Sequence, residues 1–229
     1  MQQQETRKRT IRSFVRRTGR LTPGQARALG ELWPAYGLEY SAGLLDLEKI
    51  FGRSGEKILE IGFGNGESLI DLAQANPTMD FIGVEVHEPG VGHCLINARE
   101  ANVTNLRVIM HDAIEVLQQQ IADAALSRIN LLFPDPWPKK RHHKRRIVRA
   151  AFLQLAAAKL QPAGTLHIAT DWTNYAEHID EVVAACEHFR VDQKSEHFGD
   201  QGLARSTTKF EKRGLKKGHK IFDWRLIRN

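Results

Sequence analysis

Short apolar segments alternate five times with segments of helical length between residues 57 and 188, and this alternation is the strongest constraint on the fold. The apolar segments are KILEIGFG, DFIGVEV, LRVIMHDA, INLLFPD and GTLHIATD. Helices are expected over residues 67–75, 88–101, 113–126, 145–160 and 173–188. Strands this apolar are typical of a parallel sheet that helices cover on both faces. We therefore predict an α/β fold with a doubly wound, mostly parallel sheet that binds ligands at the carboxyl ends of its strands.

The segments on either side of this alternation predict two further parts of the chain, an antiparallel strand pair at the sheet edge and an N-terminal arm. Residues 189–195 and 220–227 are expected to form an antiparallel pair at the edge of the sheet, because 221–227 alternates imperfectly between apolar and polar residues. Residues 1–36 lack a sustained apolar period, so we expect a basic, mobile N-terminal arm there. The folded domain is expected over residues 37–229.

Composition excludes several classes of protein. The 229 residues are 41% hydrophobic, which is enough for one sizeable core, but no segment approaches the roughly 18 apolar residues of a membrane-spanning helix. The basic N-terminus lacks the apolar part of a secretory signal. Cys94 and Cys186 lie far apart, without a metal-ligand or disulfide spacing. We expect a cytoplasmic protein that binds no metal and no membrane, and a monomer without an obligatory protein partner.

The net charge of +6 at pH 7 arises from three basic clusters, over residues 7–20, 139–146 and 209–220. Lys and Arg side chains that contact phosphates release counterions, and the resulting affinity is independent of sequence and falls with salt. A single cluster is equally well explained as a solvated surface. Three clusters together favour a polyanionic partner.

The first apolar segment ends in a glycine-rich turn, LEIGFGNGE. Gly62, Gly64 and Gly66 allow a tight turn and the close approach of backbone N–H groups to a ligand. A dinucleotide-binding turn has a small residue where this chain has Glu67, and a glutamate there would repel a pyrophosphate. The turn therefore favours a nucleoside without phosphates at this point, and it disfavours a dehydrogenase.

Three acids lie at the ends of the first three apolar segments. Glu60 suits a cationic group, Glu85 suits the two hydroxyls of a ribose, and Asp112 suits an adenine amino group. Each acid taken alone is equally well explained as a helix cap or a turn residue. Together with the glycine turn, they favour S-adenosylmethionine as the cofactor and a class I, Rossmann-like methyltransferase as the fold.

The segment LLFPDPWPKKRHHKRR, residues 131–146, joins an apolar strand directly to a basic run. Three prolines restrict the backbone around Asp135. Trp137 is expected either to stack on an unpaired base or to pack within the turn. No third ligand accompanies His142 and His143, so contact with RNA is the better explanation for them than a metal.

These motifs resemble those of the bacterial tRNA (guanine-N7-)-methyltransferases, the TrmB family. The resemblance rests on LEIGFGNG, GVEVHEPGVG, INLLFPDPWPKKRHHKRR, ATDW and TKFEKRG, and it covers the chain from about residue 40 to the end. It implies transfer of the methyl group of S-adenosylmethionine to N7 of a guanine in the variable loop of tRNA.

The resemblance also implies roles for individual residues, with Asp135 as the catalytic candidate. The cofactor is expected to contact Glu60, Gly62, Gly64, Gly66, Glu85, Asp112 and Asp135. The tRNA is expected to contact Lys139, Lys140, Arg141, His142, His143, Lys144, Arg145, Arg146, Asp171, Thr208, Lys209, Phe210 and Glu211. The simpler alternatives are a helix cap for Asp171 and an exposed polar loop for residues 208–211.

The chemistry of guanine N7 leaves the role of Asp135 open. N7 carries a lone pair and no proton, so the main requirement is alignment with the methyl group rather than a strong base. Asp135 is expected to stabilise the positive charge that develops on the purine, to accept a hydrogen bond from N1–H or the exocyclic amine, or to hold the amino group of the cofactor. The alternative functions are a methyltransferase-fold protein that acts mainly as a tRNA chaperone, and methylation of another RNA base.

Overall fold

The computed structural model describes residues 11–15, 19–197 and 208–229, and in it the five predicted strand and helix pairs are present. The strands are β1 (Lys57–Ile61), β2 (Asp80–Val84), β3 (Leu106–Ile109), β4 (Leu126–Leu132) and β5 (Leu160–Thr170). The helices that follow them are α4 (Glu67–Ala75), α5 (Glu88–Glu100), α6 (Ala113–Gln119), α7 (Ala150–Lys159) and α8 (Thr173–Ala184). Two further strands, β6 (Phe189–His197) and β7 (Ile221–Arg228), complete the sheet.

The seven strands form one sheet in the order β3-β2-β1-β4-β5-β7-β6. Strands β1 to β5 are parallel, whereas β7 runs antiparallel between β5 and β6. The prediction of a mostly parallel sheet with an antiparallel pair at one edge is confirmed. The strand order reverses between β1 and β4, and ligands bind α/β sheets at such a reversal.

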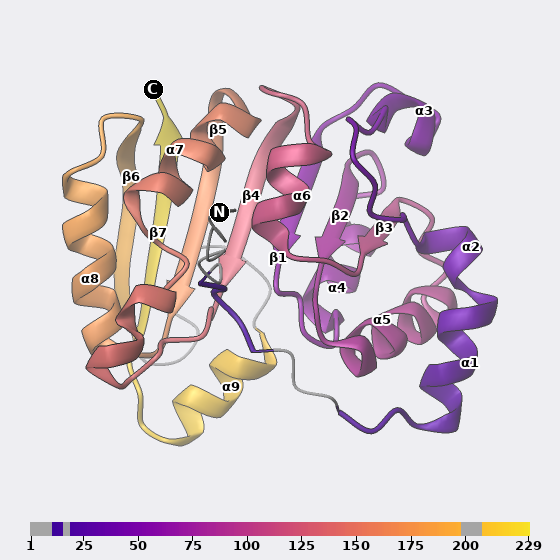
Figure 1. The fold of residues 1–229 in the computed structure, drawn as a ribbon, viewed down its shortest axis with the longest axis horizontal. Coiled ribbons are helices and arrows are strands. Elements are labelled where there is room, and N and C mark those ends of the chain that lie inside the picture. The colour runs from indigo at the N-terminus through magenta and orange to yellow at the C-terminus, as the bar shows by residue number, and fades with distance from the viewer. Residues whose placement is uncertain (1–10, 16–18, 198–207) are drawn as a thin grey trace, which may run out of the picture.

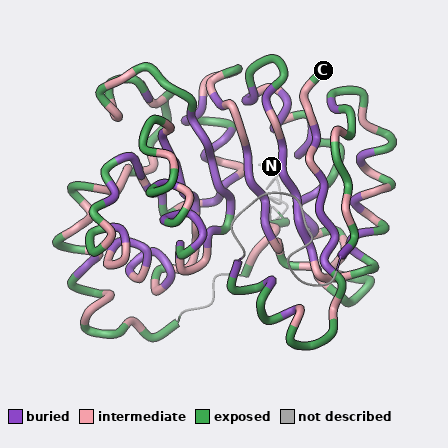
Figure 2. Tube along the Cα trace, turned by 180° about the vertical axis from the view of Figure 1, so that it is seen from behind, coloured by how far each residue is buried: buried purple, intermediate pink, exposed green. Residues whose placement is uncertain are grey.

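Two separate apolar cores lie on the two faces of the sheet. Leu59 and Ile82 point to the core that contains α6, α7 and α8, whereas their neighbours Ile58 and Phe81 point to the core that contains α4 and α5. Successive residues of a strand point to opposite faces, which explains why these strands are apolar without alternation. Figure 2 shows the buried strands between helices that are exposed on their outer sides.

Three helices are shorter than predicted, and one of them is α8, which ends at Ala184 rather than at residue 188. Helix α6 ends at Gln119 rather than at residue 126, and Ala124 in the following turn has a left-handed φ of 53°. Helix α7 begins at Ala150 rather than at residue 145, because Arg149 is extended and residues 140–145 form a separate 3-10 helix, η1 (Lys140–Arg145). The basic run therefore belongs to the connection between β4 and α7.

The expectation that ordered structure begins near Gly37 is wrong for residues 23–36. These residues form α1 (Pro23–Glu31) and α2 (Trp33–Tyr36), and α1 packs against α5. Thr22 and Gln25 form a capping box, a local signal that starts a helix where the apolar pattern is weak. Residues 1–10 and 16–18 of the predicted arm lie outside the described residues, and the division into an arm and a domain stays a prediction.

Two short helices complete the described chain. Helix α3 (Leu47–Phe51) lies at the opposite edge of the sheet from α9 (Lys209–Lys216), which lies below the carboxyl ends of the parallel strands in Figure 1. Among the residues that the structure describes, no helix is long and apolar enough to cross a membrane.

Candidate functional site

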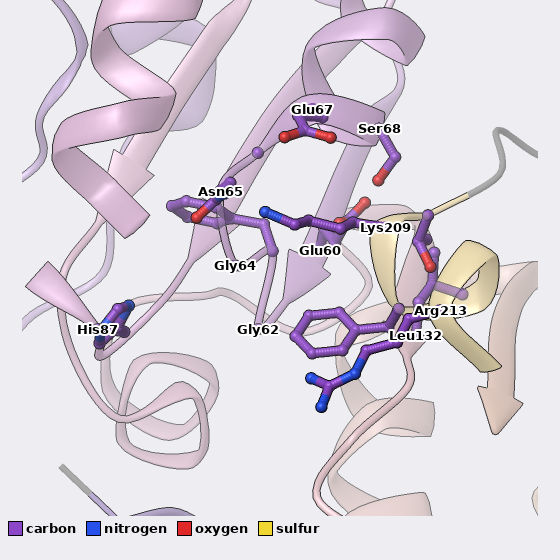
Figure 3. A pocket seen from close by; sticks show the side chains of 14 residues that line it. Glu60, Gly62, Gly64, Asn65, Glu67, Ser68, His87, Leu132, Lys209 and Arg213 are labelled. Carbon is purple, nitrogen blue, oxygen red and sulfur yellow. The ribbon is translucent and has the colours of Figure 1, made fainter. Parts of the chain in front are cut away.

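A pocket of about 290 Å³ lies between the carboxyl end of β1 and α9. One wall is formed by Glu60 and the glycine turn, and the opposite wall by α9 (Figure 3). The residues that line the pocket are Glu60, Gly62, Phe63, Gly64, Asn65, Gly66, Glu67, Ser68, His87, Leu132, Thr208, Lys209, Phe210 and Arg213. The pocket therefore lies beside the reversal of strand order between β1 and β4.

The glycine turn requires glycine for two reasons. Gly62, Gly64 and Gly66 have φ values of 73°, 60° and 80°, in the left-handed region that other residues rarely adopt. A Cβ atom on Gly66 would also lie 2.4 Å from Sγ of Cys94, and one on Gly90 would lie 2.3 Å from the carbonyl oxygen of Gly64. The turn is therefore packed directly against α5, which leaves its other side open to the pocket.

Glu60 provides the buried acid of the pocket. Its residue surface is 3% exposed, and it lines the pocket below the glycine turn. Burial raises the pKa of the nearby Cys94 thiol to about 12, and the negative charge of Glu60 acts in the same direction. Cys94 is therefore a neutral packing residue, and the predicted contact of Glu60 with a cationic group of the cofactor stays a prediction.

Glu85 fixes the shape of the glycine turn. One carboxylate oxygen accepts a hydrogen bond from the backbone N–H of Gly64 at 2.9 Å, and the other accepts from Val86 at 2.6 Å and from His87 at 2.9 Å. A carboxylate has about four acceptor positions, and these three bonds tie the turn to the end of β2. The predicted contact of Glu85 with a ribose stays a prediction.

Asp112 caps α6, as its simpler explanation expected. Its carboxylate accepts a hydrogen bond from the N–H of Ile114 at 3.0 Å. Burial raises the pKa of Asp112, and this hydrogen bond opposes the increase. Beside it, the ring of His111 stacks on Tyr40 with 3.5 Å between ring centroids. The predicted contact with adenine stays a prediction.

Asp135 lies on an exposed loop after β4 rather than in the wall of the pocket. The loop contains two residues with left-handed φ, Phe133 at 53° and Trp137 at 48°. The indole N–H of Trp137 donates to the carbonyl oxygen of Ser13 at 3.0 Å, and Arg145 lies over its ring at 4.8 Å. Trp137 therefore packs against the N-terminal segment and the basic run, and its predicted stacking on an unpaired base stays a prediction.

The basic segment after this loop divides into exposed and buried cations. Lys139, Lys140, Arg141 and Lys144 are exposed. The pKa of His142 is lowered by desolvation and by the neighbouring cations, so this ring is mostly neutral at pH 7. His143 and Arg145 are half-buried.

The prediction that Arg146 contacts RNA is wrong, because the side chain is buried in the protein. Its residue surface is only 1% exposed, and its guanidinium donates hydrogen bonds within the protein to Pro136 and Asn174. A cation that is enclosed in this way has no surface left for an RNA phosphate.

Residues 208–211 form the start of α9, so the alternative of an exposed polar loop is wrong. The Thr208 hydroxyl accepts from the N–H of Glu211 at 3.1 Å, and the Glu211 carboxylate accepts from the N–H of Thr208 at 3.3 Å. This capping box is visible in the sequence as Thr-x-x-Glu, a signal that the sequence analysis missed. Lys209 and Phe210 are exposed and line the pocket.

Asp171, at the end of β5, holds the other end of α9. Its carboxylate lies 3.0 Å from Nδ1 of His219. A Cβ atom on Gly214 of α9 would lie 2.8 Å from the same carboxylate. Asp171 thus positions α9 over the pocket, and its predicted contact with RNA stays a prediction.

Comparison with known proteins gives the family. Residues 54–224 match the family described as a putative methyltransferase. The tRNA (guanine-N(7)-)-methyltransferase of Alkalilimnicola ehrlichii is 54% identical over 95% of this chain and 92% of its own length. That of Shewanella piezotolerans is 52% identical over 94% of this chain and 91% of its own length. The chain belongs to the tRNA (guanine-N(7)-)-methyltransferase family.

Solved structures of other methyltransferases share the fold of this family member. The 16S rRNA methyltransferase KamB is 12% identical, with a TM-score of 0.59 over 81% of this chain and 94% of that protein. A variant of the 16S rRNA (adenine(1408)-N(1))-methyltransferase of Catenulisporales acidiphilia, solved with its cosubstrate SAM, is 17% identical, with a TM-score of 0.58 over 79% of this chain and 88% of that protein. The predicted class I methyltransferase fold is confirmed.

In this member of the tRNA (guanine-N(7)-)-methyltransferase family, the pocket joins two groups of predicted residues that are far apart in the sequence. It brings together Glu60, Gly62, Gly64, Gly66, Thr208, Lys209 and Phe210. The other predicted residues lie outside its lining. Sequence analysis missed His87, Leu132 and Arg213. Of these, Arg213 could have been predicted from the sequence. It follows Lys209 by four residues and therefore lies on the same side of a helix.

Proposed function

We propose that this chain transfers the methyl group of S-adenosylmethionine to N7 of a guanine in tRNA, at the guanosine of the variable loop. The observation that carries the proposal is the pocket in which a buried acid and a glycine turn face the cations of α9, in a chain of this family. The chain is therefore an S-adenosylmethionine-dependent enzyme that modifies tRNA.

The residues of the pocket fit the amino-acid end of the cofactor. The volume of about 290 Å³ is close to the lower end of the range of about 300–1,000 Å³ for small-molecule sites. Glu60 is placed to receive the α-amino group. Lys209 and Arg213 enter from α9, opposite Gly62 and Gly64 (Figure 3), and neither forms an ion pair with a described residue. These two cations are available for the α-carboxylate.

The chemistry requires alignment and electrostatic stabilisation. S-adenosylmethionine supplies an electrophilic methyl group on a positively charged sulfur. Guanine N7 attacks with its own lone pair, so no residue has to remove a proton before the attack. Positive charge moves onto the purine during the transfer, and a fixed carboxylate beside the ring stabilises it. Asp135 is exposed and outside the pocket lining, which supports a role facing the guanine over one on the cofactor amino group.

The exposed cations after Asp135 provide a path for the RNA backbone. Contacts to phosphates position a nucleic acid without reading its sequence. Residues 133–138, which include Asp135, form the catalytic loop of this proposal. The exposed cations next to it are Lys139, Lys140, Arg141 and Lys144, so phosphates that they bind bring the variable loop towards Asp135.

The test is incubation of the protein with an unmodified tRNA transcript and methyl-labelled S-adenosylmethionine, followed by digestion to nucleosides and mass spectrometry. Labelled 7-methylguanosine is expected, and it should be lost in a control transcript with adenosine at the variable-loop position. Label in another nucleoside would overturn the specificity. Binding of cofactor and tRNA without any label would favour the chaperone function.

A further inference from the structure

Arg146 connects the catalytic loop to a different part of the fold. Its Nε donates to the carbonyl oxygen of Pro136 at 3.0 Å, next to Asp135. Its Nη2 donates to Oδ1 of Asn174 at 2.7 Å, and its Nη1 donates to the backbone oxygen of Asn174 at 3.3 Å. Asn174 lies in the first turn of α8. The loop after β4 is therefore joined to the helix after β5 through one guanidinium group.

The environment of Arg146 holds the guanidinium in one orientation. Its carbon Cζ lies 4.8 Å from the ring centroid of Tyr175. Tyr175 is itself fully buried, and its hydroxyl accepts a hydrogen bond from the N–H of Val148 at 3.3 Å. Within the described part of the chain, no carboxylate forms an ion pair with Arg146. Its partners are carbonyl oxygens, Nε2 of His143 at 3.3 Å and an aromatic face, which are directional contacts rather than charge neutralisation.

The catalytic loop needs such an attachment because its backbone is strained. Phe133 and Trp137 have left-handed φ values on either side of Asp135, and non-glycine residues keep this conformation only where the surrounding structure imposes it. The N–H of Phe133 donates to the carbonyl oxygen of Ala169 at 2.8 Å, which fixes the start of the loop. Pro134 and Pro136 have no N–H to donate. The carbonyl of Pro136 is thus a point at which the middle of the loop is held.

We infer that Arg146 and Asn174 are positioning residues that set the direction in which Asp135 faces the target guanine. The planar fork of arginine reaches Pro136 and Asn174 at the same time, which the single ammonium group of lysine cannot do in the same geometry. The inference rests on the proposed function, because it assigns these residues to the alignment step of that reaction.

The first test compares Arg146→Lys with Lys144→Gln, which removes an exposed cation two residues away. Displacement of a reacting group by about 1 Å costs roughly 100-fold in rate, so Arg146→Lys is expected to lower kcat about 10- to 100-fold. Its Kd values for tRNA and for S-adenosylmethionine should stay within about threefold of those of the wild type. Lys144→Gln, at a residue assigned to the path of the RNA backbone, is expected to lower kcat/KM by raising the KM for tRNA.

The second test separates positioning from packing at Asn174. Asn174→Asp keeps an oxygen acceptor for Arg146, whereas Asn174→Ala removes it. We expect Asn174→Ala to lower kcat several-fold and Asn174→Asp to restore most of the wild-type value. Thermal unfolding and cofactor titration would show whether Arg146→Lys folds. If it does not, the two Asn174 variants still distinguish a positioning role from a packing role.

Three results would overturn the inference. The first is an unchanged kcat in Arg146→Lys and Asn174→Ala. The second is a loss of tRNA affinity in Arg146→Lys, which would return Arg146 to the RNA-binding role that its sequence position predicts. The third is an equal loss of kcat in Asn174→Ala and Asn174→Asp together with weaker cofactor binding, which would indicate a general structural role. A wild-type protein that makes no 7-methylguanosine would instead refute the proposed function itself.

Discussion

At the scale of single residues, the site separates two acids that the sequence places in one group. Glu60 is 3% exposed beneath the glycine turn and lines the pocket. Asp135 is exposed on a loop outside the pocket lining. A buried carboxylate suits a fixed cationic group, whereas an exposed one can meet a base that arrives with the RNA. Under the proposed function, Glu60 is expected to contact the cofactor and Asp135 the guanine, so substitutions at them should have different kinetic effects.

Substitution of the exposed acid should affect the chemical step. Loss of one group that stabilises developing charge typically costs about 100- to 1,000-fold in kcat, so Asp135→Ala is expected to reduce single-turnover methylation by this amount. Filter binding should show a Kd for tRNA close to that of the wild type, because Asp135 is not a phosphate ligand. A comparable loss of tRNA affinity would contradict the assignment of Asp135 to the chemical step.

Substitution of the buried acid should affect cofactor binding. A hydrogen bond to a charged group is worth about 1.5–3 kcal/mol, which corresponds to roughly a 10- to 100-fold increase in Kd. We expect Glu60→Gln to weaken S-adenosylmethionine binding by this amount in calorimetry. Glu88→Gln is the control, because Glu88 is exposed at the start of α5 and outside the pocket lining. Equal effects in both variants would indicate only a long-range charge effect.

At the scale of elements, the start of α9 is set by neighbouring residues, whereas the position of the helix depends on the rest of the fold. Thr208 and Glu211 start the helix through contacts within four residues. Its place over the pocket depends on the contact of His219 with Asp171, which directly follows β5. The capping box and the alternating strand that follows are thus local properties, whereas the meeting of α9 with the glycine turn is not.

Removal of a cation from α9 should weaken the binding of S-adenosylmethionine, because the cation is expected to contact only the amino-acid end of the cofactor. Arg213→Gln is expected to raise the Kd for S-adenosylmethionine about tenfold, from the loss of one charged contact. Binding of 5′-methylthioadenosine, which lacks the amino-acid end, should be unchanged. Lys212→Gln is the matched control, since Lys212 is exposed on the same helix and does not line the pocket. Equal weakening for both ligands would place Arg213 elsewhere in the site.

The cap of α6 should show a dependence of stability on pH. Burial raises the folded-state pKa of Asp112 above the ordinary value of 3.8. Its ionised form therefore lowers the free energy of unfolding at neutral pH, and this cost disappears as the pH falls through the folded-state pKa towards 3.8. Asparagine caps helices as well as aspartate, so Asp112→Asn should raise Tm at pH 7.

The difference in Tm between Asp112→Asn and the wild type should narrow as thermal unfolding is followed from pH 8 towards pH 4. A difference that stays constant over this range would show that the charge of Asp112 is not its cause. Weaker cofactor binding by the same variant at pH 7 would support the predicted contact of Asp112 with adenine.

At the scale of the whole molecule, the exposed cations and the pocket lie at one edge of the sheet. The exposed part of the segment after β4 follows the carboxyl end of that strand, and α9 lies below the same edge (Figure 1). Helix α3 lies at the opposite edge. A polyanion that binds these cations is therefore brought to the side of the molecule where the pocket opens.

Removal of the exposed cations should reduce the salt dependence of tRNA binding. Replacement of Lys139, Lys140, Arg141 and Lys144 by alanine is expected to lower the slope of log Kobs against log salt concentration by about 0.7–0.9 for each lost phosphate contact. Lys49→Ala is the control, because Lys49 is exposed on α3 at the other edge. An unchanged slope in the fourfold variant would place the RNA on another surface.

The sequence alone determined the features that depend on neighbouring residues. The apolar pairs in β1 and β2 predict a sheet that is buried on both faces, because adjacent side chains of a strand point to opposite sides. The glycines of the first turn predict a tight turn, and Gly62, Gly64 and Gly66 form it with left-handed backbone. The motifs of the pocket and of the catalytic loop also indicate the family, because their residue types and order can be recognised without coordinates.

Tertiary structure decided which residues of these motifs are buried and which partners they contact. Arg146 has the same charge as its neighbours, but the fold encloses it between Pro136 and Asn174 and removes it from the exposed basic surface. Glu85 is held by Gly64, 21 residues earlier, and Arg213 reaches the pocket of Glu60 from the other end of the chain. Charge and spacing are properties of the local sequence, whereas burial and hydrogen-bond partners arise only when distant segments pack together.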